Sequence, residues 1–195
     1  MTWMPSEPSP STEAAAFPSC TDDGEDVEIL DVRIAGASAL DAVVLERPEV
    51  VDVVLDGCDV AGALGRSGRA SRVVVRDSRL RAVTWVNGIV QDALFDNVTG
   101  TDLSFRFSTL RRVLFRDCVL PALDLTDAVI ETARFERCDL RGAVFDGAKV
   151  KKLRFEGCDL AGCTGAAALS GASVHPDDLL SLGPSLATAL GLTIE

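Results

Sequence analysis

Apolar residues recur at every fifth position through most of the chain. From Leu40 to Leu160, the multiples of five carry an apolar side chain at every place except Gly65 and Gly100. A second and usually smaller apolar residue lies two positions earlier. A period of five fits neither the 3.6-residue helix nor the two-residue alternation of a plain strand. It predicts a chain that turns a corner every five residues, with the first and third residues of each pentapeptide facing inward.

The cysteines indicate how many pentapeptides make one coil. Cys58, Cys118, Cys138 and Cys158 are separated by 60, 20 and 20 residues. A coil of four pentapeptides places these positions directly above one another, and such ladders form the continuous core of a solenoid. The spacing therefore predicts an all-β solenoid with four sides, built from in-frame pentapeptides over residues 38–162.

The last repeats resemble a known family. The segments Cys138-Asp139-Leu140-Arg141-Gly142 and Cys158-Asp159-Leu160-Ala161-Gly162 are similar to the Ala-(Asp/Asn)-Leu-x-x unit of the pentapeptide repeat proteins. The resemblance implies a right-handed, four-sided parallel β-helix, and it is far more specific for fold than for function. It also brings a functional alternative, because some members of the family resemble duplex DNA in size and negative charge, inhibit DNA gyrase and give quinolone resistance.

Composition and phase divide the chain into three parts. Residues 1–26 contain four prolines and six acidic residues without apolar periodicity, which predicts a disordered leader. The pentapeptide-repeat β-helix is expected over residues 27–174. Its frame slips by one residue near Gly36 and slips back after Leu160. A short α-helical cap is expected over residues 175–195.

One stretch of the predicted coil has little bulk. Residues 64–72 keep the phase but are rich in Gly, Ser and Arg. They form either an in-frame coil or a mobile loop, and we favour the coil. Trp85 lies twenty residues after Gly65, so its side chain is expected to fill the space left by that glycine.

The C-terminal segment changes period. Residues 176–182 predict a helix start with acidic residues in its first turn, Gly183-Pro184 predicts its interruption, and residues 185–191 predict a second short helix. One apolar stripe is expected on these helices, formed by Leu179, Leu182, Leu186 and Leu190. Because the last coil leaves N–H and C=O groups unpaired, the segment is expected to cap the solenoid; the alternative is a homodimer interface through residues 176–191.

No constellation of residues predicts a catalytic or metal site. Metal sites need ligands that converge on one point at short spacings, whereas the repeat places one thiol per coil in an apolar interior. Two structural core ladders are predicted: Cys58, Cys118, Cys138 and Cys158, and Phe95, Phe115, Phe135 and Phe155. His175, the only histidine, is expected to form a hydrogen bond at the helix entry. We expect no enzyme activity, no cofactor and no bound metal.

The acidic residues are concentrated at the front of the chain. The net charge is −11, and residues 1–60 hold fourteen acidic residues against two arginines, while residues 61–195 hold sixteen against seventeen basic residues. Mimicry of DNA needs sustained negative charge, and the second of these segments lacks it.

Basic residues recur on one predicted outer face. These residues are Arg69, Arg72, Arg111, Arg112, Lys149, Lys151 and Lys152. We expect them either to form a charge ladder with acidic residues of neighbouring coils or to form an interaction face. The positive charge is interrupted by Asp92 and Glu131, and exposed aromatic residues are scarce, so direct nucleic-acid binding is not expected.

The leading functional hypothesis is a non-enzymatic scaffold or protein-interaction module whose partner is another protein. The alternative is a DNA-mimicking inhibitor of DNA gyrase. The sequence has no apolar run long enough to span a membrane and shows no signal peptide, so we expect a cytoplasmic protein with reduced cysteines.

Overall fold

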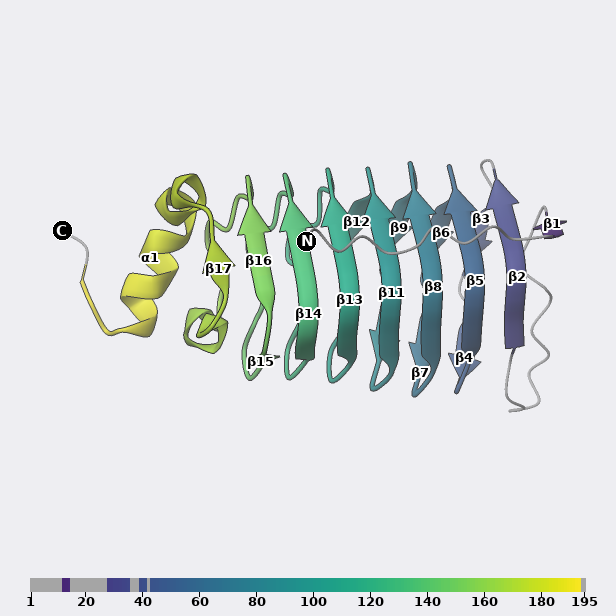
Figure 1. Ribbon diagram of the computed structural model, residues 1–195, viewed down its shortest axis with the longest axis horizontal. Helices are drawn as coiled ribbons and strands as arrows, with labels where there is room; N and C mark the ends of the chain where they lie inside the picture. Colours follow the sequence, from purple (N-terminus) through teal and green to yellow (C-terminus); the bar gives the residue numbers. More distant parts are fainter. Residues whose placement is uncertain (1–11, 15–27, 36–38, 42, 194–195) are drawn as a thin grey trace.

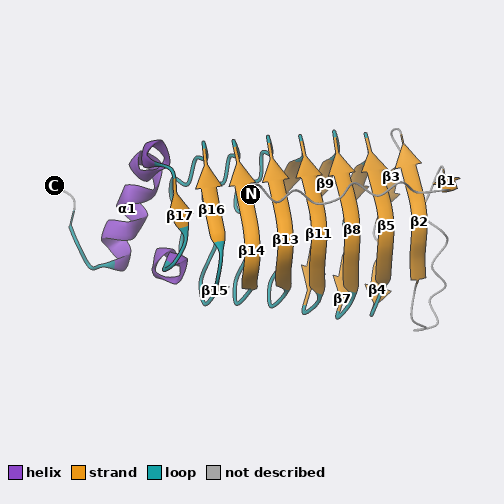
Figure 2. Cartoon of the chain, in the orientation of Figure 1, coloured by secondary structure: helices purple, strands orange, loops and turns teal. Residues whose placement is uncertain are grey.

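The chain folds into a stack of parallel coils that ends in a helix. The computed structural model describes residues 12–14, 28–35, 39–41 and 43–193. The strands lie across the long axis of the molecule and are stacked side by side along it, starting with β2 near one end. The helix α1 lies at the other end (Figure 1). Figure 2 shows that α1 follows the last strand. The predicted all-β solenoid with a short helical C-terminal segment is confirmed.

Most strands have either three or eight residues. In chain order the elements are β1 (Thr12–Ala14), β2 (Glu28–Ala35), β3 (Ala39–Asp41), β4 (Val44–Glu46), β5 (Glu49–Asp56), β6 (Asp59–Ala61), β7 (Leu64–Arg66), β8 (Arg69–Arg76), β9 (Arg79–Arg81), β10 (Thr84–Val86), β11 (Ile89–Asp96), β12 (Thr99–Thr101), β13 (Thr109–Arg116), β14 (Val129–Glu136), β15 (Lys149–Val150), β16 (Leu153–Glu156), the 3-10 helix η1 (Ala166–Leu169), β17 (Ser173–Val174), the 3-10 helix η2 (Pro176–Asp178) and α1 (Leu179–Ala189). The predicted leader falls outside the described residues except for β1, which pairs in parallel with β2.

Within the described part of the chain, the strands form three parallel sheets. The largest has ten strands in the order β1-β2-β5-β8-β11-β13-β14-β16-β17, with β15 also paired to β14. The order β12-β9-β6-β3 makes a four-stranded sheet, and β10-β7-β4 makes a three-stranded sheet. Consecutive coils are therefore hydrogen-bonded to each other along more than one side.

The register of the sheets follows the predicted phase. In the body of the solenoid residues pair with those twenty positions later, as Val90 does with Leu110. The one exception among the described pairings there is a local irregularity between β13 and β14, where Arg111 pairs with Thr132. Between β2 and β5 the offset is 21, since Ile29 pairs with Val50, and between β16 and β17 it is 19, since Phe155 pairs with Val174. Both one-residue slips are confirmed.

The backbone bends at regular places. Positive φ values recur two residues after the multiples of five, for example at Asp52 (φ 57°) inside β5 and at Asp92 (φ 52°) inside β11. Asp, Asn and Gly tolerate this left-handed conformation better than other residues, and they occupy many of these positions, including Asp77, Asn87, Asn97, Asp102, Asp117, Asp127, Gly142, Gly147, Gly157 and Gly162. The chain thus turns every five residues; the four-sided cross-section and the right-handed sense stay predictions.

Residues 64–72 lie within the coil. Leu64–Arg66 pair in register with both β4 and β10, and Arg69 pairs with Glu49 and Ile89 on its two sides. The in-frame prediction is therefore confirmed, and the protruding loop is wrong.

The C-terminal segment forms one continuous helix rather than two. Pro184 lies inside α1, where it removes the hydrogen bond to the carbonyl group of Leu180. Both residues are exposed to solvent, so water can hydrate that carbonyl group. Leu182 on one side of the proline is buried, and Leu186 on the other side packs against the core, which holds both halves of the helix in place.

The apolar stripe on this helix is shorter than predicted. Leu182 and Leu186 pack on the core, whereas Leu179 and Leu190 are 47% and 74% exposed. A serine of α1 also covers the last coil, because the Ser181 hydroxyl accepts a hydrogen bond from the Leu160 N–H at 3.0 Å. An edge group that would otherwise lack a partner is thereby satisfied.

Candidate interaction surface

Opposite charges are stacked at the bends of consecutive coils. The Arg72 guanidinium donates two hydrogen bonds to the Asp52 carboxylate, both at 2.5 Å. Two coils further on, Arg112 donates in the same way to Asp92, at 2.5 and 2.6 Å. The residues lie twenty apart in each pair, so the coil repeat itself places a guanidinium over a carboxylate.

Further pairs of this kind follow the outer surface. They include Arg76–Asp56, Arg116–Asp96, Arg137–Asp117 and Arg111–Glu131. The hydrogen bond from Arg72 lowers the pKa of Asp52, and that from Arg137 lowers the pKa of Asp117. These carboxylates therefore stay ionised into acid conditions, and much of the negative charge on the coils is compensated by neighbouring arginines.

The lysines differ from most of the arginines. Lys149, Lys151 and Lys152 are the only lysines of the chain. All three are exposed, and none forms an ion pair with any residue that the structure describes. We call these three residues the lysine corner. They lie at and just after β15, where the long strand of earlier coils is interrupted before β16 begins.

The ladder positions explain why Lys151 and Lys152 have no partners among the described residues. Lys152 stands one coil above Thr132, which replaces the carboxylates found at Asp52 and Asp92. Lys151 stands above Glu131, but that carboxylate is already paired with Arg111 at 3.0 Å. The lysine corner is thus a concentration of three positive charges that no described residue compensates.

The seven basic residues predicted to share a face fall into two groups. Arg72, Arg111 and Arg112 are engaged in pairs between coils. Arg69 is exposed and makes no ion pair within the described residues, but it stands apart in β8, four coils before the lysine corner. Of these seven residues, the structure therefore brings together three, the lysines, that have no ion pair within the part of the chain it describes.

The predicted core ladders lie in the interior. Cys58, Cys118, Cys138 and Cys158 are at most 5% exposed. The rings of Phe95, Phe115, Phe135 and Phe155 stack in order, with centroid distances of 4.6, 4.6 and 5.5 Å. Aromatic pairs at these distances add stabilisation beyond the area they bury.

The cysteine ladder has a polar role that the apolar pattern does not reveal. The Cys118 thiol donates to the carbonyl group of Phe95 at 3.4 Å and to that of Arg116 at 3.1 Å, and Cys138 repeats this contact with Phe115 and Glu136. At the equivalent place two coils before Cys118, the Ser78 hydroxyl donates to the carbonyl group of Arg76 at 2.6 Å and accepts from the Cys58 N–H at 3.0 Å. The presence of Ser78 on a cysteine ladder is the sequence signal for this role.

Most of the thiols are poor candidates for nucleophiles or metal ligands. Burial raises the pKa of Cys58 and of Cys163, whereas the hydrogen bond with the Cys138 thiol lowers the pKa of Cys118, a side chain that is only 1% exposed. The pKa of Cys138 is raised to about 12, chiefly by its contact with the Cys118 thiol, with burial adding to the effect. Metal binding and nucleophilic attack both need the thiolate, and no cluster of metal-ligating side chains occurs among the described residues.

His175 lies at the junction of β17 and η2. Its Nδ1 atom accepts a hydrogen bond from the Asp177 N–H at 3.4 Å and so caps the 3-10 helix. The predicted role at the helix entry is confirmed. The described helices contain none long and apolar enough to cross a membrane.

Comparisons with known proteins concern the fold. Residues 89–164 match the family model described as pentapeptide repeat region. Comparison with curated proteins gave no match. Among solved structures, the chain is similar to QnrB1, described as a plasmid-mediated fluoroquinolone resistance protein. One trypsin-treated variant is 16% identical with a TM-score of 0.35, covering 83% of this chain and 99% of that one. A second variant is 13% identical with a TM-score of 0.30, covering 88% and 100%, respectively.

Proposed function

Because the chain carries a pentapeptide repeat region, we propose that it is a non-enzymatic scaffold that binds another protein through the lysine corner. The observation that carries this proposal is the contrast between the paired arginines and the unpaired lysines. A basic side chain without a partner is free to bind a carboxylate of a second protein, and complementary charge steers association and fixes orientation.

The partner that fits this surface is an acidic protein segment. Lys149, Lys151 and Lys152 present three ammonium groups within four residues on the outside of a rigid coil. A segment with several Asp or Glu residues offers the matching charge, and the flat flank of a solenoid gives such a segment room to extend. Association of this kind weakens as salt is added, because exposed charges are screened.

The alternative function, inhibition of DNA gyrase by DNA mimicry, has less support from the surface. Several carboxylates on the coils, Asp52, Asp92 and Asp96 among them, are bound by an arginine of the next coil. A surface of compensated pairs does not reproduce the continuous negative charge of a phosphate backbone. The supercoiling reaction of gyrase nevertheless provides a direct test.

The test compares three forms of the full chain. One form carries Lys149→Gln, Lys151→Gln and Lys152→Gln. Its matched control removes the same charge from exposed arginines elsewhere, through Arg66→Gln, Arg79→Gln and Arg81→Gln. Binding to a synthetic peptide of ten glutamates is measured by calorimetry at low and physiological salt.

The wild type and the arginine control should bind the peptide, and the lysine variant should bind at least ten-fold more weakly. Equal binding by all three forms, or no binding by the wild type, would contradict the proposal. Inhibition of gyrase supercoiling at micromolar protein by the wild type and the lysine variant alike would favour the alternative function.

The exposed leucines in and just after α1 support a second copy of the chain as a further partner. Leu180 and Leu190 are 87% and 74% exposed, and Leu179 and Leu192 are also exposed. Large apolar side chains exposed at one end of a molecule commonly mark an interface. We accordingly retain the homodimer through residues 176–191 as part of the proposal, together with a cytoplasmic location suited to free thiols.

A further inference from the structure

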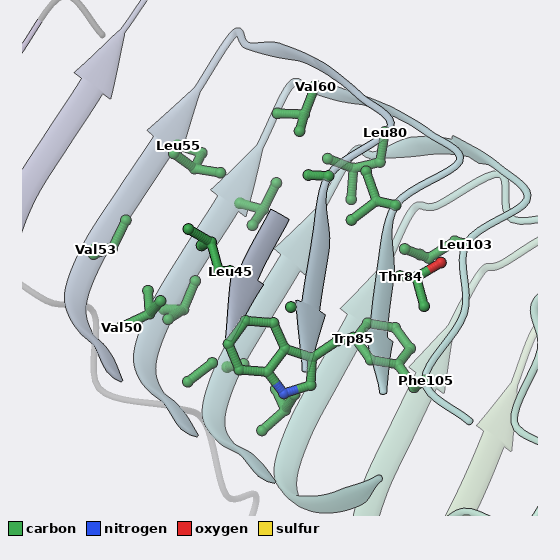
Figure 3. Close-up of a pocket in the computed structure, with 18 of the residues that line it drawn as sticks. Leu45, Val50, Val53, Leu55, Val60, Leu80, Thr84, Trp85, Leu103 and Phe105 are labelled. Carbon is green, nitrogen blue, oxygen red and sulfur yellow. The ribbon is translucent and has the colours of Figure 1, made fainter. Parts of the chain in front are cut away.

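The interior of the solenoid is not filled evenly. A cavity of about 160 Å³ lies between the first described coils and Phe105 (Figure 3). Its lining is almost wholly apolar and includes Leu45, Val60, Leu80 and Trp85, which surround the space in the close-up. From Phe115 to Phe155 the stacked rings occupy the corresponding part of the core.

The cavity has a cause in the sequence of one coil. The coil from Cys58 to Asp77 has Val60, Gly65, Ala70 and Val75 at its four central inward positions. The corresponding positions two coils later hold Gly100, Phe105, Leu110 and Phe115, whose side chains have a larger total volume. In the coils after that, the total volume of the side chains at these positions is larger again. The backbone repeat keeps the coils at constant spacing, so smaller side chains leave space rather than a narrower coil. The Trp85 ring fills this space beside Gly65, and the rest of it forms the cavity.

The cavity is accessible from one side. Leu45, Ala63, Val83 and Trp85 line it and are only partly buried. At the equivalent positions of later coils, Phe105 is 4% exposed and Leu125 and Phe145 are fully buried. The cavity therefore approaches the surface at the sheet formed by β4, β7 and β10.

We propose that this cavity binds a small apolar molecule of about the size of benzene. An apolar cavity of about 150 Å³ in another protein stays dry and takes up benzene or xenon, and the volume and lining found here are of the same kind. A lining this poor in polar groups offers water few hydrogen-bonding partners, whereas a hydrocarbon gains dispersion contacts with the side chains around it. The proposal concerns the core and is independent of the lysine corner.

The experiment measures the thermal unfolding of the full chain with increasing benzene. A ligand that binds only the folded state raises Tm progressively, with the logarithm of its concentration once that exceeds Kd. We expect a rise of about 5 °C at a benzene concentration of roughly 100 Kd for a protein of this size. The double variant with Ala70→Val and Ala93→Val places four extra methyl groups in the cavity lining, so the rise should be lost. Valine occurs at neighbouring ladder positions, at Val50 and Val90 beside Ala70 and at Val73 and Val113 beside Ala93.

The matched control is Ala133→Val, which adds methyl groups at the ladder position of Ala93 but in the filled part of the core. Its benzene-dependent rise in Tm should equal that of the wild type, whatever its starting Tm. A wild type without a benzene-dependent rise in Tm, or a double variant that keeps the rise, would overturn the proposal.

A second measurement reports on the site itself. The chain has two tryptophans, so in a Trp3→Phe variant the fluorescence comes from Trp85 alone. Because Trp85 lines the cavity, its emission should change with benzene and reach a plateau, with a Kd that also accounts for the rise in Tm. A rise in Tm without any change in this emission would place the ligand elsewhere and contradict the assignment, even if the double variant failed to fold.

Discussion

The indole ring of Trp85 lies against Gly65, the residue one coil earlier on the same ladder. A Cβ atom on Gly65 would lie 2.5 Å from Cε3 of Trp85, well inside van der Waals contact. Trp85 and Gly65 are register partners in β10 and β7. The ring therefore occupies the space where the glycine has no side chain, which confirms the expected compensation.

Gly65→Ala should destabilise the protein. The added methyl group would displace the indole ring, and overpacking of this kind costs about 1–3 kcal/mol in the free energy of unfolding. Urea denaturation measures the change. Gly65→Ala in a Trp85→Leu background is the control, because the added Cβ atom then no longer meets the indole ring and the cost should fall. A Gly65→Ala protein as stable as the wild type would show that the ring moves without cost.

Ser78→Ala should lose more stability than its small change in volume implies. The hydroxyl satisfies both the Arg76 carbonyl group and the Cys58 N–H, and a buried group left without a partner costs about 1–3 kcal/mol. Ser78→Cys should retain part of this stability, since thiols bind the carbonyl groups at the other places of the ladder. Ser170→Ala, at an exposed site, should change the free energy of unfolding by less than about 0.5 kcal/mol.

The contribution of the Asp52–Arg72 pair should depend on pH. Because the pKa of Asp52 is lowered in the folded state, the pair stabilises the protein above the ordinary carboxyl pKa of 3.8. The stabilisation is lost as the pH falls through the lowered value. At neutral pH, Asp52→Asn should cost up to about 1 kcal/mol, as for an exposed pair, and the difference from the wild type should vanish in strong acid.

The control for this pH dependence is Asp102→Asn. Asp102 occupies an equivalent bend with φ 53°, a conformation that Asn also tolerates. It makes no ion pair within the described residues, so its replacement should change stability little at neutral pH. An equal loss from both substitutions would show that the bend, and not the ion pair, carries the effect.

Removal of the exposed leucines on α1 should dissociate the proposed homodimer. The double variant Leu180→Asp and Leu190→Asp places charges on side chains that are largely exposed in the single chain, so the fold of the monomer should persist. Sedimentation should show a dimer for the wild type and a monomer for the variant. Val44→Asp, at an exposed site near the other end of the solenoid, should remain dimeric; a monomeric wild type would refute the interface.

The sequence repeat predicts the coil well because equivalent inward positions of successive coils lie in the same apolar environment and therefore carry similar residues. The period of five and the cysteines twenty apart are enough for the register of β5 to β14, and the slips near Gly36 and after Leu160 follow from the phase alone. The bends were less visible, although the frequent Asp, Asn and Gly two residues after the central positions indicate them. Local sequence thus determines most of the solenoid.

Features that depend on packing between distant residues were predicted less well. The helix continues across Pro184 because Leu182 and Leu186 both pack on the core. The Gly183-Pro184 pair predicts a helix break from local sequence alone, and local sequence contains no information on those two contacts. The hydrogen bonds of the cysteine thiols depend on where carbonyl groups of the preceding coil point. The lysine corner differs from most of the arginines in lacking ion pairs within the described residues, and ion pairs depend on which residues the coils bring together.

The constant offset of twenty residues restricts how the length of this protein can change. Insertion of twenty residues between Leu110 and Ile130 would add one coil and leave every later side chain above its former counterpart. Insertion of five residues would rotate all later ladders by one segment, so that Phe115 would no longer stack below Phe135. Duplication of whole coils is therefore the route by which such a rod can lengthen and keep its interior matched.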